Sequence, residues 1–174
     1  MSQISAPTAE EYAPYYGRYV EKVGPDSLAA LEAQAKGTAA LLATTPESLG
    51  EHRYAPGKWS VKEVIGHLSD SERVFSYRAL RIGRGDTIDL PGFDENQFVP
   101  AGRFERRTLA DIAAEFAAVR AATLALFRSF DADAVLRMGS ANGQPVSVRA
   151  LAAILAGHEL HHLGLLRERY GLKG

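Results

Sequence analysis

The sequence predicts an all-α domain built as a four-helix bundle. Four long stretches carry apolar residues at helical spacing, segments rich in glycine and proline separate them, and one connection is much longer than the others. The chain has 174 residues, of which 46% are hydrophobic and 24% charged, and this suffices for one good core. We therefore expect a single domain over residues 1–174, with a short N-terminal helical arm at about 8–23 and the bundle at about 26–170.

The first two helices have clear start and stop signals. The first follows the letters GPDS, and its leucines recur at helical spacing until TTPESLG ends it. The second is predicted over about 61–83, where GRGD ends it. Ser60 and Glu63 have the spacing of a capping box, in which hydroxyl and carboxylate each accept a hydrogen bond from the other residue's amide.

The last two helices also carry terminal signals. The third is predicted over about 108–130, with apolar residues on one face. The fourth begins at the cap residue Ser147 and continues to residue 169 or 170, where Gly171 provides a left-handed stop.

The connections differ greatly in length. Between the second and third helices, DTIDLPGFDENQFVPAGRFERR shows neither helical nor convincing strand periodicity, and long connections of this kind often help to form a functional site. The segment RMGSANGQPVSV joins the third and fourth helices, and its Asn-Gly pair predicts a turn or a small hairpin. At the N-terminus, EEYAPYYGRYVEKV predicts a short helix broken near Pro14, with its tyrosines packed against the bundle.

Composition excludes several classes of function. Lys and Arg number 20 against 21 Asp and Glu, the net charge is -1, and there is no basic tract, so nucleic acid is not an expected partner. The absence of cysteine excludes disulfides, thiolate metal sites and a cysteine nucleophile. The sequence shows no secretory signal pattern and no apolar run long enough to span a membrane, so we expect a cytoplasmic protein with no membrane partner.

The stretch GHELHHLGLL, at 157–166, contains three of the five histidines of the chain. On a helical wheel His158 and His162 continue the apolar stripe of the fourth helix, so they face the bundle interior. One turn apart, two imidazoles can bind the same ion. His161 lies about 100° round from His162 and is expected to face a neighbouring helix surface or solvent.

A third ligand is available on the second helix. A catalytic metal site usually takes three protein ligands and keeps one open position, and His67 falls on the inward face of its helix. His52, in the loop LGEHRYAPGK, is expected to be exposed. Because buried imidazoles need their polar atoms satisfied, a shared metal is favoured, and a hydrogen-bonded polar cluster is the alternative.

Read from His158, the letters also spell H-E-x-x-H, the zinc-protease motif. The extended motif requires a third histidine six places after His162, where Glu168 stands, and only twelve residues follow His162. The sequence also has little strand signal with which to hold a peptide. A protease of this type is therefore not expected, and Glu159 is interpreted as a solvated or salt-bridging residue beside the site.

Three stretches carry a family resemblance: YAPGKWSVKEVIGHLSDSERVFSYR, LPGFDENQF and GHELHHLGLLRERY. Together they resemble the DinB-like superfamily and, within it, the YfiT-type metal-dependent hydrolases, over about residues 26–170. The resemblance implies a four-helix bundle with an up-up-down-down style of crossover, and a divalent metal, zinc or nickel, bound by His67, His158 and His162. It also implies a homodimer, and reactions that include thiol S-transfer or isomerisation with low-molecular-weight thiols.

The expected function is that of a metal-dependent enzyme acting on a small-molecule substrate, as a hydrolase or a thiol S-transferase. The alternative is a non-catalytic metal-binding stress-response protein. Three neutral imidazoles leave the ion its full charge, so a water or thiol bound to it loses its proton more easily. Asp94 and Glu159 are the candidate catalytic carboxylates. The long connection, with Asp94, Glu95 and Asn96, can fold over the mouth of the site and offer a carboxylate as acid, base or further ligand, although turn formation after Pro91-Gly92 explains these residues equally well.

Residues around the predicted ligands also have expected roles. Glu63 and Asp70 are candidates to accept the second ring N–H of His67, although both also fit as surface charges. Trp59 is expected to be a packing anchor rather than a substrate wall. Arg120 falls near the inner face of the third helix and is expected to pair with a buried carboxylate rather than with an anionic substrate.

Overall fold

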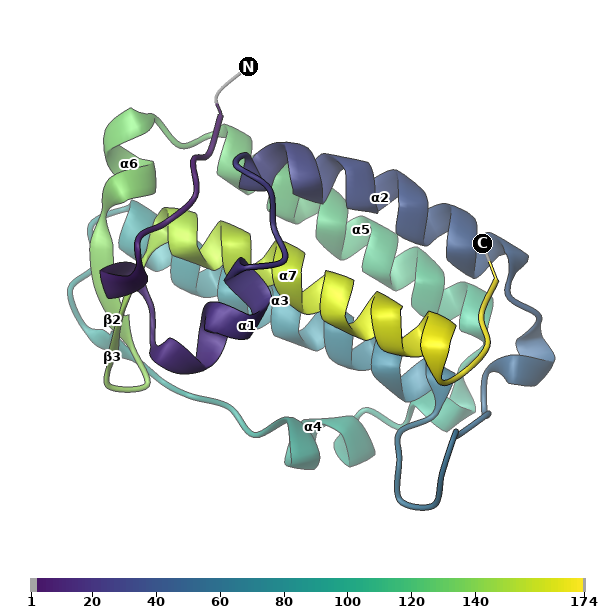
Figure 1. Cartoon of the computed structure of the whole chain (residues 1–174). Helices are drawn as coiled ribbons and strands as arrows, with labels where there is room; N and C mark the ends of the chain where they lie inside the picture. Colours follow the sequence, from purple (N-terminus) through teal and green to yellow (C-terminus); the bar gives the residue numbers. More distant parts are fainter. Residues whose placement is uncertain (1–2, 174) are drawn as a thin grey trace.

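Four long helices dominate the computed structural model, which describes residues 3–173 (Figure 1). They are α2 (Ser27–Thr44), α3 (Val61–Gly83), α5 (Leu109–Arg128) and α7 (Val148–Glu168). The predicted all-α bundle is confirmed, and each helix lies within a few residues of its predicted bounds. Each also begins at a side chain that accepts a backbone N–H, namely Asp26, Ser60, Thr108 and Ser147.

The helices α2 and α3 occupy opposite corners of the bundle, and each packs against both α5 and α7 (Figure 1). Helices α3 and α5 run parallel, as do α2 and α7, and the two pairs are antiparallel to each other. The order along the chain is therefore up, down, down, up, which corrects the up-up-down-down order that the resemblance implied. Only the connection between α3 and α5 must return along the whole bundle, which explains its length.

The long connection, residues 84–108, contains more regular structure than the sequence predicted. It includes strand β1 (Asp89–Leu90), helix α4 (Glu95–Ala101) and a 3₁₀ turn (Phe104–Arg106). Helix α4 has only one buried residue, Val99, and contains Pro100, so it has no apolar stripe that a pattern could reveal. The ring of Phe104 lies directly on Gly66 of α3, where any side chain would overlap it, and so anchors the connection.

The predicted Asn-Gly hairpin is confirmed. Strands β2 (Met138–Ala141) and β3 (Gln144–Ser147) pair antiparallel on either side of Asn142 and Gly143, whose φ angles are 55° and 70°. Strand β1 pairs in parallel with β2 and completes a three-stranded sheet at one end of the bundle, beside the short helix α6 (Ala132–Leu136) (Figure 1). Neither β1 nor α6 was predicted, because elements of two and five residues are too short to show periodicity.

A layer of polar side chains crosses the middle of the bundle and divides its core into two hydrophobic clusters. In each long helix the apolar residues before and after this layer belong to different clusters. Within the layer, Arg120 of α5 donates two hydrogen bonds of 2.7 Å to Glu72 of α3 and forms an ion pair of 2.6 Å with Glu159 of α7. The hydroxyl of Thr38, on α2, donates to Glu159, so all four helices contribute to the layer.

The N-terminal arm runs along α7 (Figure 1). It consists of two 3₁₀ turns (Ala9–Glu11 and Pro14–Tyr16) and the short helix α1 (Gly17–Val20). A short helical arm was predicted here with a break at Pro14. Pro14 instead begins the second turn, a position that suits its fixed φ and its missing N–H.

Two contacts hold the arm on α7. The Glu11 carboxylate accepts a hydrogen bond of 2.6 Å from the Ser147 hydroxyl and one of 2.7 Å from Nε of Arg149. Farther along, the backbone of Tyr19 lies directly on Gly157. The arm can approach α7 this closely only because residue 157 has no side chain.

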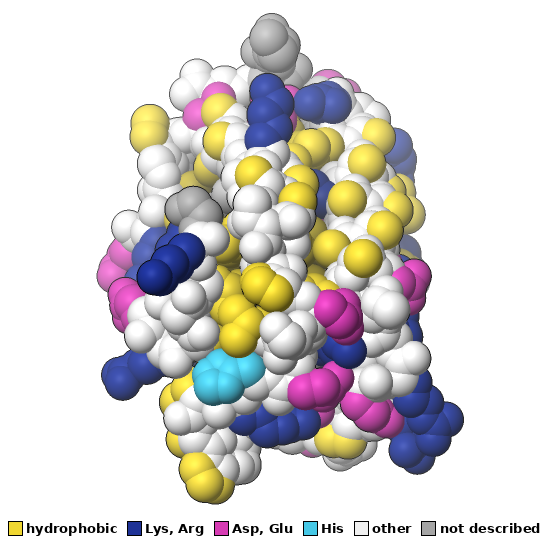
Figure 2. Space-filling model, turned by 90° about the vertical axis from the view of Figure 1, so that its right-hand side faces the viewer, with side chains coloured by type: hydrophobic (Ala, Val, Ile, Leu, Met, Phe, Trp, Pro, Cys, Tyr) yellow, Lys and Arg dark blue, Asp and Glu magenta, His cyan; other side chains and the backbone are white. Residues whose placement is uncertain are grey.

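The end of the bundle near the C-terminus has a mixed surface. Figure 2 shows Lys and Arg side chains interspersed with Asp and Glu on this face, with no continuous basic tract. Within residues 3–173, no helix is long and apolar enough to cross a membrane.

We predict that Gly157→Ala will destabilise the protein by about 1–3 kcal/mol, because the new methyl group would overlap the carbonyl of Tyr19. Gly164→Ala, on the same helix with open space around it, should be neutral or stabilising by up to about 1 kcal/mol. Denaturant unfolding would measure the free energy of unfolding of both variants. Hydrogen exchange would show whether the destabilisation by Gly157→Ala is centred on the arm. Equal stability of the two variants would contradict the docking of Tyr19 on α7.

The ion pair of the arm should also depend on pH. Burial by itself would raise the pKa of Glu11, but hydrogen bonds from Arg149 and Ser147 outweigh it and lower this pKa from 4.5 to about 2. A carboxylate with a lowered pKa in the folded state stabilises that state above its unfolded pKa, and this contribution disappears as the pH falls through the folded pKa.

We therefore predict that Glu11→Gln lowers the free energy of unfolding by about 1–2 kcal/mol at neutral pH. The difference from the wild type should shrink between pH 4.5 and about 2. Thermal unfolding at a series of pH values would measure it, with Glu10→Gln, whose carboxylate does not contact Arg149, as the control. A difference that stays constant down to pH 2 would rule out this ion pair as its cause.

Candidate metal centre

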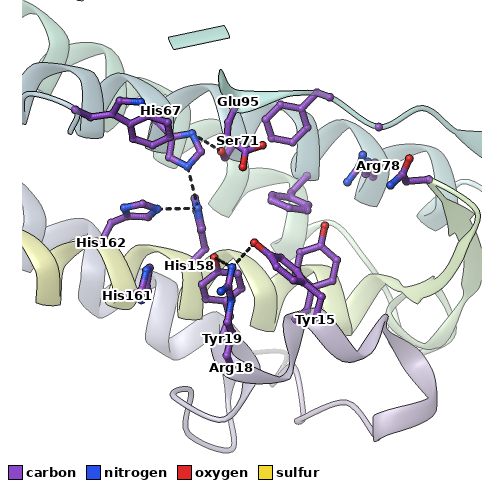
Figure 3. A pocket seen from close by; sticks show the side chains of 16 residues that line it. Tyr15, Arg18, Tyr19, His67, Ser71, Arg78, Glu95, His158, His161 and His162 are labelled. Carbon is purple, nitrogen blue, oxygen red and sulfur yellow. Dashed lines mark hydrogen bonds between the residues drawn. The ribbon is translucent and has the colours of Figure 1, made fainter. Parts of the chain in front are cut away.

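Three histidines from two helices meet inside the bundle. His67 comes from α3, and His158 and His162 come from adjacent turns of α7 (Figure 3). The Nε2 atom of His158 lies 3.1 Å from Nε2 of His67 and 3.1 Å from Nε2 of His162, and ligand atoms of all three lie within 4.8 Å of one another. The structure thus brings together the three residues that the sequence selected.

Burial keeps these imidazoles neutral. The three residues are between 6% and 9% exposed. Burial lowers the pKa of His67 to about 4, and burial together with neighbouring His67, His161 and Arg18 lowers the pKa of His162 to about 3. Burial also lowers the pKa of His158, well below 6.5. At neutral pH each ring therefore keeps a nitrogen lone pair, as a metal ligand must.

Hydrogen bonds among the rings alone would satisfy this group poorly. A neutral imidazole has one N–H and one lone pair, yet Nε2 of His158 faces two other Nε2 atoms at the same distance. In addition, Nδ1 of His162 is buried without a partner. A cation with three nitrogen ligands at about 2.0–2.1 Å in tetrahedral geometry would set them about 3.3 Å apart. The donor atoms and their spacing therefore fit a divalent cation better than a hydrogen-bonded cluster.

The residue that contacts the second ring nitrogen of His67 is neither of the two predicted carboxylates, Glu63 and Asp70. Nδ1 of His67 lies 3.4 Å from the hydroxyl of Ser71, one turn along α3. Glu63 forms the capping box with the start of α3, and Asp70 lies 3.5 Å from Arg73, so neither carboxylate contacts the imidazole. Ser71 is placed correctly because residues four apart share one face of a helix.

The two candidate catalytic carboxylates lie outside the pocket at the histidines. Asp94 is exposed and caps α4, accepting the N–H of Asn96 at 2.9 Å. Glu159 is 1% exposed and faces the polar layer, where it pairs with Arg120. The predicted pairing of Arg120 with a buried carboxylate is confirmed. In a zinc protease the glutamate of H-E-x-x-H would face the metal, whereas here it points to the other side of the helix.

A pocket of about 240 Å³ opens beside the three histidines (Figure 3). Its walls come from α3, α7, the N-terminal arm and the long connection. Aromatic side chains form much of the lining, among them Tyr16, Tyr19, Phe75 and Phe93. Three charged side chains, Arg18, Arg78 and Glu95, also border it.

Three aromatic residues singled out in the sequence take different places around this pocket. Trp59 lines it, with its ring centroid 4.8 Å from that of His67, so it is more than the packing anchor that was predicted. His161 also lines it and faces a neighbouring helix, the first of the two predicted alternatives, with its ring 5.5 Å from that of Tyr19 on α1. His52 is exposed, as predicted.

Several pocket residues escaped the sequence analysis. Arg78 had a usable signal, because His67, Ser71, Phe75 and Arg78 follow one another at four, four and three residues and so share one face of α3. Tyr19 and Phe93 had none, since they reach the pocket through contacts between segments far apart in the chain.

The fold and the site together define the class of this protein. It is a helical bundle with a candidate metal centre of three buried histidines and an adjoining pocket. The chain belongs to the DinB superfamily, whose family model matches residues 30–166. A comparison with curated proteins found no match.

Several solved structures share this fold. YfiT from Bacillus subtilis, described as a probable metal-dependent hydrolase with an unusual four-helix bundle topology, is 17% identical, with 97% of this chain and 95% of that chain covered and a TM-score of 0.68. The DinB-like protein YjoA from Bacillus subtilis is 18% identical, with 83% and 89% covered and a TM-score of 0.60. A mycothiol-dependent maleylpyruvate isomerase is 14% identical, with 83% of this chain but only 59% of that chain covered and a TM-score of 0.63.

We predict that the chain binds one divalent cation, and that alanine at position 67, 158 or 162 weakens the binding by at least about 100-fold. Loss of a residue that only hydrogen-bonds to a metal ligand weakens metal binding by about 10- to 100-fold, and loss of the ligand itself costs more. His52→Ala should leave the affinity unchanged. Calorimetry with Zn²⁺ would measure this. Quenching by Ni²⁺ gives a second readout, because Trp59 is the only tryptophan and lies beside His67. Stoichiometric binding that survives His158→Ala would contradict the assignment.

Proposed function

We propose that this protein is a metal-dependent enzyme that acts on a small molecule, by hydrolysis or by thiol transfer. The observation that carries the proposal is the position of three buried, neutral imidazoles at the wall of a pocket of about 240 Å³. The pocket is smaller than those that hold drug-sized ligands, which points to a small substrate. The descriptions of YfiT as a probable metal-dependent hydrolase and of the isomerase as mycothiol-dependent support these two reaction classes.

The chemistry would be divided between the cation and the protein. A divalent cation at the histidines would lower the pKa of a water or thiol within its reach, which makes either a nucleophile at neutral pH. His67, His158 and His162 carry no charge themselves, so they leave the charge of the cation undiminished. Trp59 and Phe75 line part of the pocket with apolar surface.

Glu95 is the carboxylate best placed to accept a proton. It lies on α4, is half-buried, and borders the pocket (Figure 3). A general base must come within hydrogen-bond reach of the reacting group, a condition that Asp94 and Glu159 do not meet because neither lines the pocket. We therefore assign the role of proton acceptor to Glu95 in place of these two residues.

We predict turnover by the metal-loaded protein in one of two panels. The first tests hydrolysis of small esters and amides, and the second tests conjugation of a chlorinated aromatic or an epoxide with several low-molecular-weight thiols. His158→Ala should lose metal and activity together, and Glu95→Gln should keep the metal but lower kcat by about 10²–10⁴-fold. His52→Ala serves as the control with unchanged activity.

Two outcomes would count against the proposal. Activity that survives His158→Ala after the metal is lost would exclude a metal-dependent reaction. Metal binding without turnover in either panel would favour the alternative, a non-catalytic metal-binding stress-response protein.

Three further expectations stay predictions: that the metal is zinc or nickel, that the protein is a homodimer, and that it is located in the cytoplasm.

A further inference from the structure

Two buried arginines in this protein have very different surroundings. Arg120, 2% exposed, binds two carboxylates in the polar layer. Arg78, 4% exposed, donates one hydrogen bond of 2.7 Å from Nη2 to the carbonyl of Pro91, and its Nε is buried without a partner. Within residues 3–173, no carboxylate forms an ion pair with Arg78. Its partners are one carbonyl oxygen and the ring of Phe75, so no carboxylate compensates the desolvation of this guanidinium.

The side chain of Arg78 borders the same pocket as the three histidines. Figure 3 shows it at one end of this pocket and the histidines at the other. Both His67 and Arg78 stand on one face of α3, with about 16 Å of helix between their backbones. A ligand in the pocket can therefore extend from the candidate metal centre toward the arginine.

Aromatic rings line part of the space between the two ends, and the polar side chains of Ser71 and Glu95 also border the pocket. The ring of Phe75 lies 6.0 Å from that of Tyr16 and 6.5 Å from that of Phe93, and these rings form the walls between the histidines and Arg78. Cζ of Arg78 lies 5.3 Å from the centroid of the Phe75 ring, so an aromatic face holds the guanidinium in place. The pocket has a volume of about 240 Å³, which is about eight times the volume that one water molecule occupies in the liquid.

We propose that Arg78 forms an anion subsite, and that the substrate is a small molecule with a carboxylate at one end of an apolar body. The carboxylate pairs with Arg78, the apolar body lies against Phe75, and the opposite end reaches the histidines. A monoanion fits better than a dianion, because the carboxylate of Glu95 borders the same pocket. This inference rests on the proposed function for the reaction at the metal end, whereas the subsite itself depends on Arg78 alone.

Binding of matched carboxylates and amides to the chelator-treated, metal-free protein tests the subsite without any activity. The probes are benzoate, phenylacetate and hexanoate, each compared with its neutral amide by calorimetry and ligand-observed NMR. We expect at least one carboxylate to bind, its amide to bind at least about tenfold more weakly, and Arg78→Met to lose the carboxylate by at least about tenfold. Arg81→Met, on the same helix but paired with Asp86 outside the pocket, should bind like the wild type.

The outcomes separate this inference from the proposed function. Equal affinity for carboxylate and amide, equal affinity of Arg78→Met and wild type, or no carboxylate binding at all would overturn the subsite. So would carboxylate binding that appears only with metal and disappears in His158→Ala, because the anion would then be at the histidines. If Arg78→Met does not fold, the carboxylate-to-amide comparison on the wild type and Arg78→Lys decides. Loss of the subsite would leave metal-dependent turnover standing, and absence of turnover would leave the subsite standing.

Discussion

The guanidinium of Arg120 sets the register of the bundle. It binds Glu72 of α3 and Glu159 of α7 in the interior, where breaking such a pair costs about 3–5 kcal/mol. Glu72 stands five residues after His67, and Glu159 directly follows His158. The pairings that satisfy Arg120 therefore also decide how α3 and α7 lie along each other. A slip of one turn, about 5.4 Å, would leave a buried charge unpaired and would separate the histidines.

The segment GHELHH of α7 contacts three different neighbours within six residues. Gly157 faces the backbone of the arm, His158 and His162 face the pocket, and Glu159 faces Arg120. Successive residues of a helix point about 100° apart, so one short segment can reach partners on several sides. This arrangement accounts for a polar cluster within an otherwise apolar helix, and it explains why a protease motif is spelled without the protease geometry.

The walls of the pocket come from two kinds of segment. The histidines stand on α3 and α7, two long helices that Arg120 ties together, whereas Glu95, Phe93 and Tyr19 come from the long connection and the arm. The connection and the arm are held on the bundle by a few individual contacts, such as the ring of Phe104 on Gly66. The solved structures share the fold at 14–18% identity, and a fold by itself does not define a reaction. Under the proposals above, pocket residues of the connection and the arm contribute to the choice of substrate together with Arg78 of α3.

The sequence by itself determined the four helices, their caps and the inward face that carries His158 and His162, because periodicity and capping depend on residues at most four apart. It also selected His67, since an inward histidine on a second helix has few other partners. Only the tertiary structure decided that Glu159 turns to Arg120, that α4 brings Glu95 to the pocket, and that β1 pairs with β2. These contacts join segments far apart in the chain, and no local pattern records which distant partner a side chain meets.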